Sequence, residues 1–203
     1  MRLLIALVAF GTPQIASGTP RQISWWWDGR PSRKPSPVSL LSFVEKNQDI
    51  VSSVTLNCGF AVQANGSLGG NVSVPCVTAF SGLRKLKVKA ELWLGEQDSI
   101  DAARKLFKQP QLAAVALSSI ATKYSLGGIN FDLEPHKSNA SDAMAYGAFL
   151  RAIKPSINAA GARLTVDSAL WTPMLKGMSS YADGVDRVLY MHTCTLAFGL
   201  ERR

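Results

Sequence analysis

The stretch GGINFDLEP, at residues 127–135, constrains the fold more than any other part of this sequence. Successive side chains of a β-strand point to opposite faces. One face of this strand would be apolar, with Ile129, Phe131 and Leu133. The other face would be polar, with Asn130, Asp132 and Glu134. A buried carboxylate without a partner is costly, so two acids on one face of such a strand need a structural or chemical reason.

Strand-like and helix-like segments alternate along the rest of the chain. The expected strands cover residues 23–27, 51–62, 87–94, 127–134, 163–170 and 185–191. The expected helices cover residues 38–45, 77–86, 99–124 with an interruption at Pro110, 142–157 and 173–181. This alternation predicts an α/β fold, with a parallel sheet covered by helices.

Two architectures compete, an open doubly wound sheet and a closed eight-stranded (β/α)8 barrel. A doubly wound nucleotide-binding fold needs a glycine-rich turn after its first strand, whereas this chain has WWWDGR at residues 25–30. The barrel is therefore favoured. Its lumen would receive the polar face of residues 127–134, with the acids near the carboxyl end of the strand, where barrel enzymes hold their reactive groups. Strand alternation lets either Trp25 and Trp27, or Trp26 alone, point into that lumen.

The first residues predict export. A short basic start, an apolar run at residues 3–10 and small residues at 16–18 are typical of a secretory signal peptide, so we expect a signal peptide over 1–18 and one barrel domain over 19–203. The apolar run is too short to span a bilayer, and no later stretch is long enough. We expect a secreted or lumenal protein, with lysosomal placement open.

The cysteines and the N-glycosylation triplets also favour a secreted or lumenal protein. Cys58 and Cys76 flank a loop rich in Gly, Asn and Ser, which favours a disulfide over two separate thiols and leaves Cys194 over. N-glycosylation triplets begin at Asn65, Asn71 and Asn139.

The formal charge of +8 raises the question of nucleic acid. The basic residues are scattered and lack interleaved aromatic residues, so a solvated basic surface is favoured and no nucleic-acid partner is expected. The two histidines, His136 and His192, have no metal-ligand spacing, so we expect no metal and no other cofactor.

The segment GGINFDLE at 127–134 resembles the signature strand of glycoside hydrolase family 18, the chitinases and chitobiases, whose pattern is Asp-Gly-x-Asp-x-Asp-x-Glu on the fourth strand of a TIM barrel. Asp132 and Glu134 match that pattern, while Gly127 and Asn130 stand where it has Asp. The segments LWLG at 92–95, KYSLGG at 123–128 and LTVDSALW at 164–171 are also similar to family segments in the same order.

The resemblance implies a hydrolase that cleaves β-linked N-acetylglucosamine. Glu134 would donate a proton to the leaving oxygen, and Asp132 would orient the sugar's own 2-acetamido group as it attacks. Two close carboxyls in a lumen also raise the pKa of one of the pair. Asn130 would support Asp132 by a hydrogen bond. The expected substrate contacts, with core packing as the alternative for the two tryptophans, are Trp93, Trp171 and Met191.

The alternative to catalysis is an amphipathic strand with a solvated face, but the flanking helices argue against it. The last expected strand departs from the family, because Met191-His-Thr-Cys stands where Met-x-Tyr-Asp is expected. The chain would then hold about six of the eight strand–helix units. A secreted hydrolase, a glycan-binding or inactive homologue and an incomplete hydrolase all remain open. So does the substrate: chitin, chito-oligosaccharides or the chitobiose core of glycoproteins.

Overall fold

The computed structural model describes residues 23–95 and 99–191, and its centre is one parallel sheet that curls into a half-barrel. The strand order is β1-β2-β5-β6-β7-β8. The strands are β1 Ile23–Asp28, β2 Val51–Asn57, β5 Lys89–Gly95, β6 Gly128–Asp132, β7 Arg163–Ser168 and β8 Arg187–Tyr190. Among the described residues, β1 and β8 form the two edges of this sheet. The expected incomplete barrel of six strands is confirmed.

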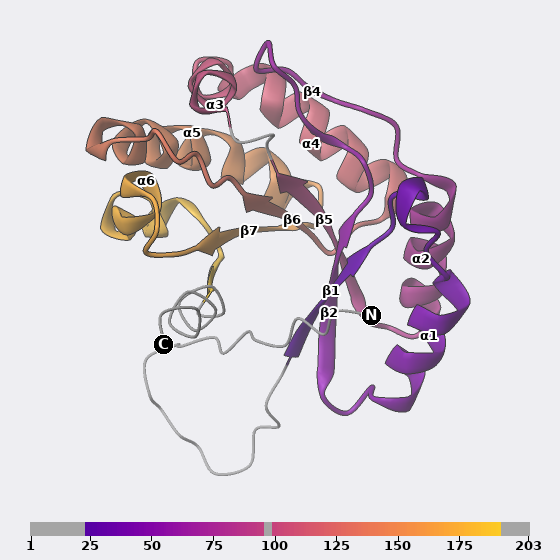
Figure 1. The fold of residues 1–203 in the computed structure, drawn as a ribbon. Coiled ribbons are helices and arrows are strands. Elements are labelled where there is room, and N and C mark those ends of the chain that lie inside the picture. The colour runs from indigo at the N-terminus through magenta and orange to yellow at the C-terminus, as the bar shows by residue number, and fades with distance from the viewer. Residues whose placement is uncertain (1–22, 96–98, 192–203) are drawn as a thin grey trace.

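Helices lie on the outer side of the curled sheet (Figure 1). They are α1 Pro37–Lys46, α2 Val74–Lys85, α3 Ile100–Phe107, α4 Pro110–Tyr124, α5 Ala140–Ala159 and α6 Pro173–Lys176. Short 3-10 turns cover Pro31–Arg33, Met178–Ser180 and Ala182–Gly184. The expected helix over 99–124 is two helices that meet at Pro110, because proline starts a helix readily but breaks one from within. No helix in the described ranges is long and apolar enough to cross a membrane.

One expected strand is wrong in length. The segment 51–62 does not run on as a single strand, because β2 ends at Asn57 and Gly59 takes a positive φ of 82°. The chain then turns into a separate antiparallel hairpin, β3 Ala61–Val62 with β4 Leu68–Gly69. This turn leaves Cys58 next to α2, where it forms a disulfide with Cys76 as predicted, with 5.7 Å between the two Cα atoms. Cys194 lies outside the described residues.

The two faces of β6 are divided as the sequence predicts. Ile129, Phe131 and Leu133 are fully buried, and the Phe131 ring meets Phe149 of α5 edge-on with 5.9 Å between ring centroids. Apolar burial against the helices therefore orients the strand, and Asn130 and Asp132 must face the concave side. The strand ends at Asp132, so Glu134 lies just past it rather than within it.

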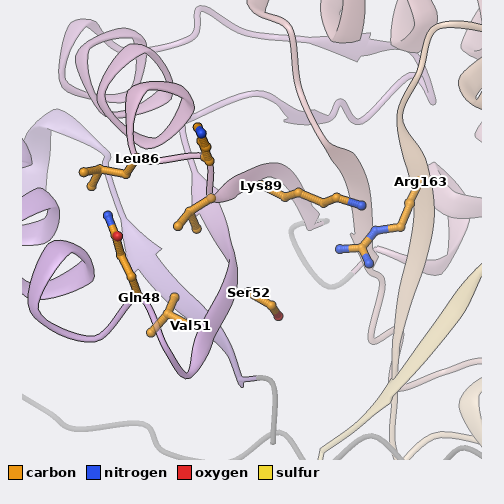
Figure 2. Close-up of a pocket in the computed structure, with 8 residues that line it drawn as sticks. Gln48, Val51, Ser52, Leu86, Lys89 and Arg163 are labelled. Atoms are coloured by element: carbon orange, nitrogen blue, oxygen red, sulfur yellow. The ribbon is translucent and has the colours of Figure 1, made fainter. Parts of the chain in front are cut away.

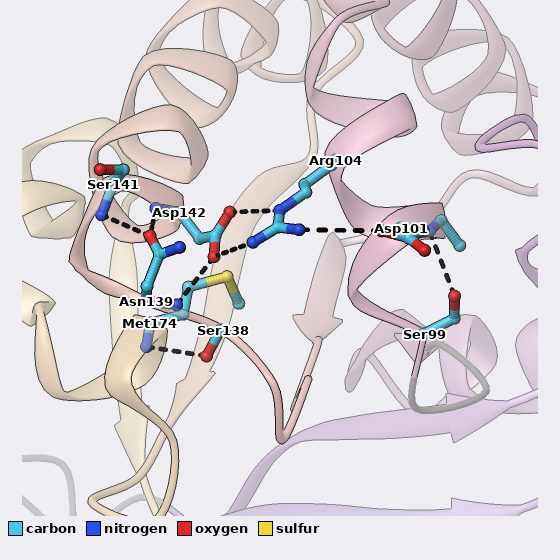
Figure 3. A network of polar contacts seen from close by, with 9 residues as sticks. Ser99, Asp101, Arg104, Ser138, Asn139, Ser141, Asp142 and Met174 are labelled. Atoms are coloured by element: carbon cyan, nitrogen blue, oxygen red, sulfur yellow. Dashed lines mark hydrogen bonds and ion pairs between the residues drawn. The ribbon is translucent and has the colours of Figure 1, made fainter.

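A polar network fixes the start of α5, the helix that follows β6 (Figure 3). The Asn139 side-chain oxygen accepts hydrogen bonds from the backbone N–H groups of Ser141 and Asp142, at 2.9 and 3.2 Å. The Asp142 carboxylate accepts the Asn139 backbone N–H in return, which completes a capping box. Arg104 of α3 donates two hydrogen bonds to the same carboxylate, at 2.8 and 3.0 Å. The network thus ties α5 to α3 beside the carboxyl end of β6.

This geometry leaves Asn139 able to carry a glycan, because the residue is exposed and the cap uses its side-chain oxygen, not its amide nitrogen. Ser141→Ala is expected to abolish glycosylation at Asn139 without weakening the cap, since Ser141 contributes its backbone N–H. Asn139→Ala should abolish the glycan and also lower the free energy of unfolding by about 1 kcal/mol. Glycopeptide mass spectrometry of secreted protein and urea unfolding of the deglycosylated variants measure the two effects. An unmodified Asn139 in the wild-type protein would contradict the expectation.

Candidate active site

The two candidate catalytic acids lie at the carboxyl ends of the central strands. Asp132 is the last residue of β6 and pairs with Gly95, the last residue of β5. Glu134 follows two residues later, and both side chains are partly exposed. In parallel barrels this end of the sheet is the one where loops assemble a site.

A tryptophan N–H holds each acid. Trp93, inside β5, donates its indole N–H to Oδ2 of Asp132 at 2.9 Å. Trp171, three residues past β7, donates its indole N–H to Oε2 of Glu134 at 2.6 Å. The sequence left these tryptophans open between sugar contact and core packing. In the structure each contacts one of the two acids.

Burial and neighbouring charge raise the pKa of Asp132 well above its usual value. Burial is the largest cause, followed by the nearby carboxyls of Asp167 and Glu134. A hydrogen bond between the Asp132 and Glu134 carboxyls raises the pKa further, while the Trp93 N–H lowers it. Asp132 therefore holds a proton at a higher pH than an exposed aspartate does.

The predicted hydrogen bond from Asn130 to Asp132 is wrong. The Asn130 side chain is fully buried and donates its amide N–H to Oδ1 of Asp167 on β7 at 2.9 Å. The pairing of β6 with β7 explains this, since Asn130 lies opposite Thr165 and Asp167 is the next residue on the same face. Asn130 therefore bridges toward the neighbouring strand instead of along its own.

Asp167 is a site residue that the sequence reasoning missed. Burial raises its pKa to about 7; the Asn130 hydrogen bond and the Arg187 charge oppose that rise, and the charges of Glu91 and Glu134 add to it. Its signal was present in the sequence, because Thr165 and Asp167 are alternate polar residues in an otherwise apolar strand.

A second missed group lies lower in the concave face. The carboxylate of Glu91, on β5, is fully buried and pairs with Arg163 at 2.6 Å. It also accepts a hydrogen bond of 3.0 Å from the Thr165 hydroxyl. Arg163 starts β7 and Arg187 starts β8, so the lower part of the half-barrel is an ionic layer that joins three strands.

A cavity of about 470 Å³ opens at the opposite end of the sheet from the acids. Its lining includes Val51, Lys89 and Arg163, the first residues of β2, β5 and β7. Figure 2 shows the Lys89 and Arg163 side chains pointing toward each other across it. This cavity lies at the amino ends of the strands and takes no part in the candidate active site.

The remaining predicted residues have varied outcomes. Trp25 packs on Phe43 of α1, at 4.4 Å between ring centroids, so Trp26 is the β1 tryptophan on the concave face. Met191 is partly buried, packs against the core and donates its backbone N–H to Ser168. His136 is exposed, and His192 lies outside the described residues. No cluster of potential metal ligands occurs in the described part of the chain.

Comparison with solved structures identifies the fold. The spore cortex-lytic enzyme SleL of Bacillus megaterium matches with a TM-score of 0.70 and 18% identity over 86% of this chain and 43% of that one. A chitinase from Chromobacterium violaceum matches with a TM-score of 0.69 and 16% identity, covering 84% and 55% of the two chains. A class V chitinase from Pseudomonas fluorescens gives a TM-score of 0.68 and 16% identity, with 85% and 54% covered.

No protein-family model and no curated protein matches the sequence. The chain spans about half the length of the solved structures it resembles. The described residues therefore have the fold of part of a chitinase-like (β/α)8 barrel, with six parallel strands and the helices that connect them, as the resemblance to glycoside hydrolase family 18 implied.

Proposed function

We propose that this protein is a retaining glycosidase of family 18 that acts on oligosaccharides of β-linked N-acetylglucosamine. The observation that carries the proposal is the pair of carboxyls, Asp132 and Glu134, at the carboxyl end of β6, each of which accepts an indole N–H. The fold shared with chitinases supports the substrate class.

In the proposed reaction Glu134 transfers its proton to the glycosidic oxygen as the bond from that oxygen to the anomeric carbon breaks. The oxygen of the sugar's 2-acetamido group forms a new bond to the same carbon. Asp132 accepts a hydrogen bond from the acetamido N–H and stabilises the positive charge of the oxazolinium. Glu134, now ionised, removes a proton from water as the water opens that ring, which restores the acid and retains the anomeric configuration.

The lower concave face supports this site without touching substrate. The Glu91–Arg163 pair and the Asn130–Asp167 hydrogen bond join polar side chains of β5, β6 and β7 below the acids. These two contacts keep the strand ends in register, which catalysis by positioned groups requires.

We also propose that the protein works in an oxidising compartment after export. The Cys58–Cys76 disulfide supports this, since disulfides persist in secreted and lumenal proteins and are rare in the cytosol. The predicted signal peptide lies outside the described residues.

The test compares two fluorogenic substrates with the purified protein. A chitobioside should be hydrolysed and the matching cellobioside, which has a hydroxyl in place of the acetamido group, should not. Equal hydrolysis of both would reject the acetamido mechanism. Chito-oligosaccharide binding without turnover would instead favour the glycan-binding alternative.

A further inference from the structure

Trp93 and Trp171 each offer one of the two acids an indole N–H. This group can donate a hydrogen bond but cannot accept one. An indole N–H is donor only, so an oxygen that receives it cannot place its own proton along that direction. Oδ2 of Asp132 and Oε2 of Glu134 each receive such a donor. Each of these hydrogen bonds thereby fixes the position of one oxygen of its carboxyl group.

The backbone is shaped to bring Trp93 to Asp132. A Cβ atom on Gly95 would lie 2.0 to 2.8 Å from three atoms of the Trp93 ring, so the ring lies directly over this glycine. Gly95 is the register partner of Asp132, whereas Trp93 itself is the partner of Asn130. The indole therefore lies over Gly95 and reaches two register pairs further along the neighbouring strand.

The other carboxyl oxygen of Asp132, Oδ1, has no such partner. It is buried and receives no N–H or O–H donor from the described residues. The Trp93 N–H is therefore a donor on which the Asp132 carboxyl depends, since a buried acceptor without a donor is costly.

From these contacts we propose that Trp93 and Trp171 are positioning residues that hold the Asp132 and Glu134 carboxyls in the orientation that the reaction needs. The inference rests on the proposed function, in which these two acids do the chemistry. It stands in place of the sugar stacking or core packing expected for both tryptophans. The charged groups that face the pair are Asp167 on β7 and, through Asp167, Glu91 on β5 and Arg187 on β8.

The first experiment reads the indoles directly. Selective ¹⁵N labelling of the five tryptophans gives a small set of indole N–H resonances, which Trp93→Phe and Trp171→Phe assign. The resonances of Trp93 and Trp171 should lie downfield. Asp132→Asn should move the Trp93 resonance, and Glu134→Gln should move the Trp171 resonance. Trp25, which packs on Phe43, is the internal control and should not move in either variant.

The second experiment uses kinetics. Trp93→Phe keeps an aromatic ring and removes the N–H, so kcat should fall about 10- to 100-fold with KM changed less than about twofold, as expected for a lost hydrogen bond to a charged group. The acidic limb of the pH–rate profile should move to higher pH, because the Trp93 N–H lowers the pKa of Asp132. If the phenylalanine variant fails to fold, benzothienylalanine at position 93 has the shape of tryptophan without the N–H and gives the same test.

The outcomes separate the two proposals. Indole resonances that Asp132→Asn and Glu134→Gln leave unchanged, or a Trp93→Phe variant that raises KM alone, would overturn the positioning role and restore sugar stacking. Indole resonances that respond to these substitutions in a protein that hydrolyses no chitobioside would support the indole–carboxyl contacts and reject the glycosidase.

Discussion

Glu134→Gln is expected to reduce turnover of a fluorogenic chitobioside by roughly 100- to 10,000-fold, the contribution typical of a positioned general acid. Glutamine has nearly the shape of glutamate, and its side-chain oxygen can still accept the Trp171 N–H that Glu134 accepts at 2.6 Å. It has no acidic proton to give to the leaving oxygen. Binding of chito-oligosaccharide should therefore stay close to that of the wild-type protein, because only a transition-state interaction is removed.

The matched control is the same substitution at Glu45, an exposed residue of α1 far along the chain from the acids. Glu45→Gln should change neither turnover nor binding. Calorimetric titration with a chito-oligosaccharide and initial rates with the chitobioside measure the two properties separately. Wild-type turnover in Glu134→Gln would remove Glu134 from the mechanism, and a parallel loss of binding would assign it to substrate recognition.

The sequence predicted the elements of this fold because each carries a local signal. The apolar alternation of residues 129–133 shows which face packs on helices, and Pro110 divides the expected helix over 99–124 into α3 and α4. The overlong strand at 51–62 failed for a reason outside the pattern. The apolar residues continue past Asn57, while the positive φ of Gly59 and the disulfide of Cys58 turn the chain away.

The acids could also be found from sequence, but their partners could not. Asp132 and Glu134 stand in a recognisable motif. The partner of Asn130 depends on how β6 is aligned with β7, and the partner of Trp93 depends on an empty slot over Gly95. The register of β6 with β7 and the direction of the Trp93 ring are set by packing between strands that are distant in sequence. The local pattern of polar and apolar residues therefore does not predict them.

Stability is expected to fall as the pH rises from about 5 to about 7.5, and Asp167 is the main reason. Its pKa is raised from an ordinary 3.8 to about 7 in the folded protein, with burial as the largest cause. The folded state then binds this proton more tightly than the unfolded chain does. The stabilisation that Asp167 contributes is fully present below pH 3.8, its ordinary pKa, and is lost as the pH rises toward its pKa in the folded protein. A difference of about three pH units corresponds to roughly 4 kcal/mol. Asp132, whose pKa is raised as well, adds to the same slope.

Groups with lowered pKa act in a different range and do not cancel this effect. Hydrogen bonds from Arg104 are the largest cause that holds the pKa of Asp142 below its usual value of 3.8. Asp142 is therefore ionised in both the folded and the unfolded states above about pH 5, and its stabilisation is lost only as the pH falls below that range. The two kinds of acid together place the stability maximum at about pH 4 to 5.

Urea unfolding across pH 4 to 8 tests this, with Asp167→Asn as the decisive variant. Asparagine keeps an oxygen for the Asn130 amide N–H, which Asp167 accepts at 2.9 Å, and it cannot ionise. The slope between pH 5 and 7.5 should become shallower in Asp167→Asn and nearly vanish when Asp132→Asn is added. Asp142→Asn is the control, because it should lower stability at every pH above about 5 and leave that slope unchanged. A wild-type protein that is equally stable or more stable at pH 7.5 than at pH 5 would show that Asp167 is ionised at little cost in the folded state. In that case Asn130 and Arg187 would outweigh its burial.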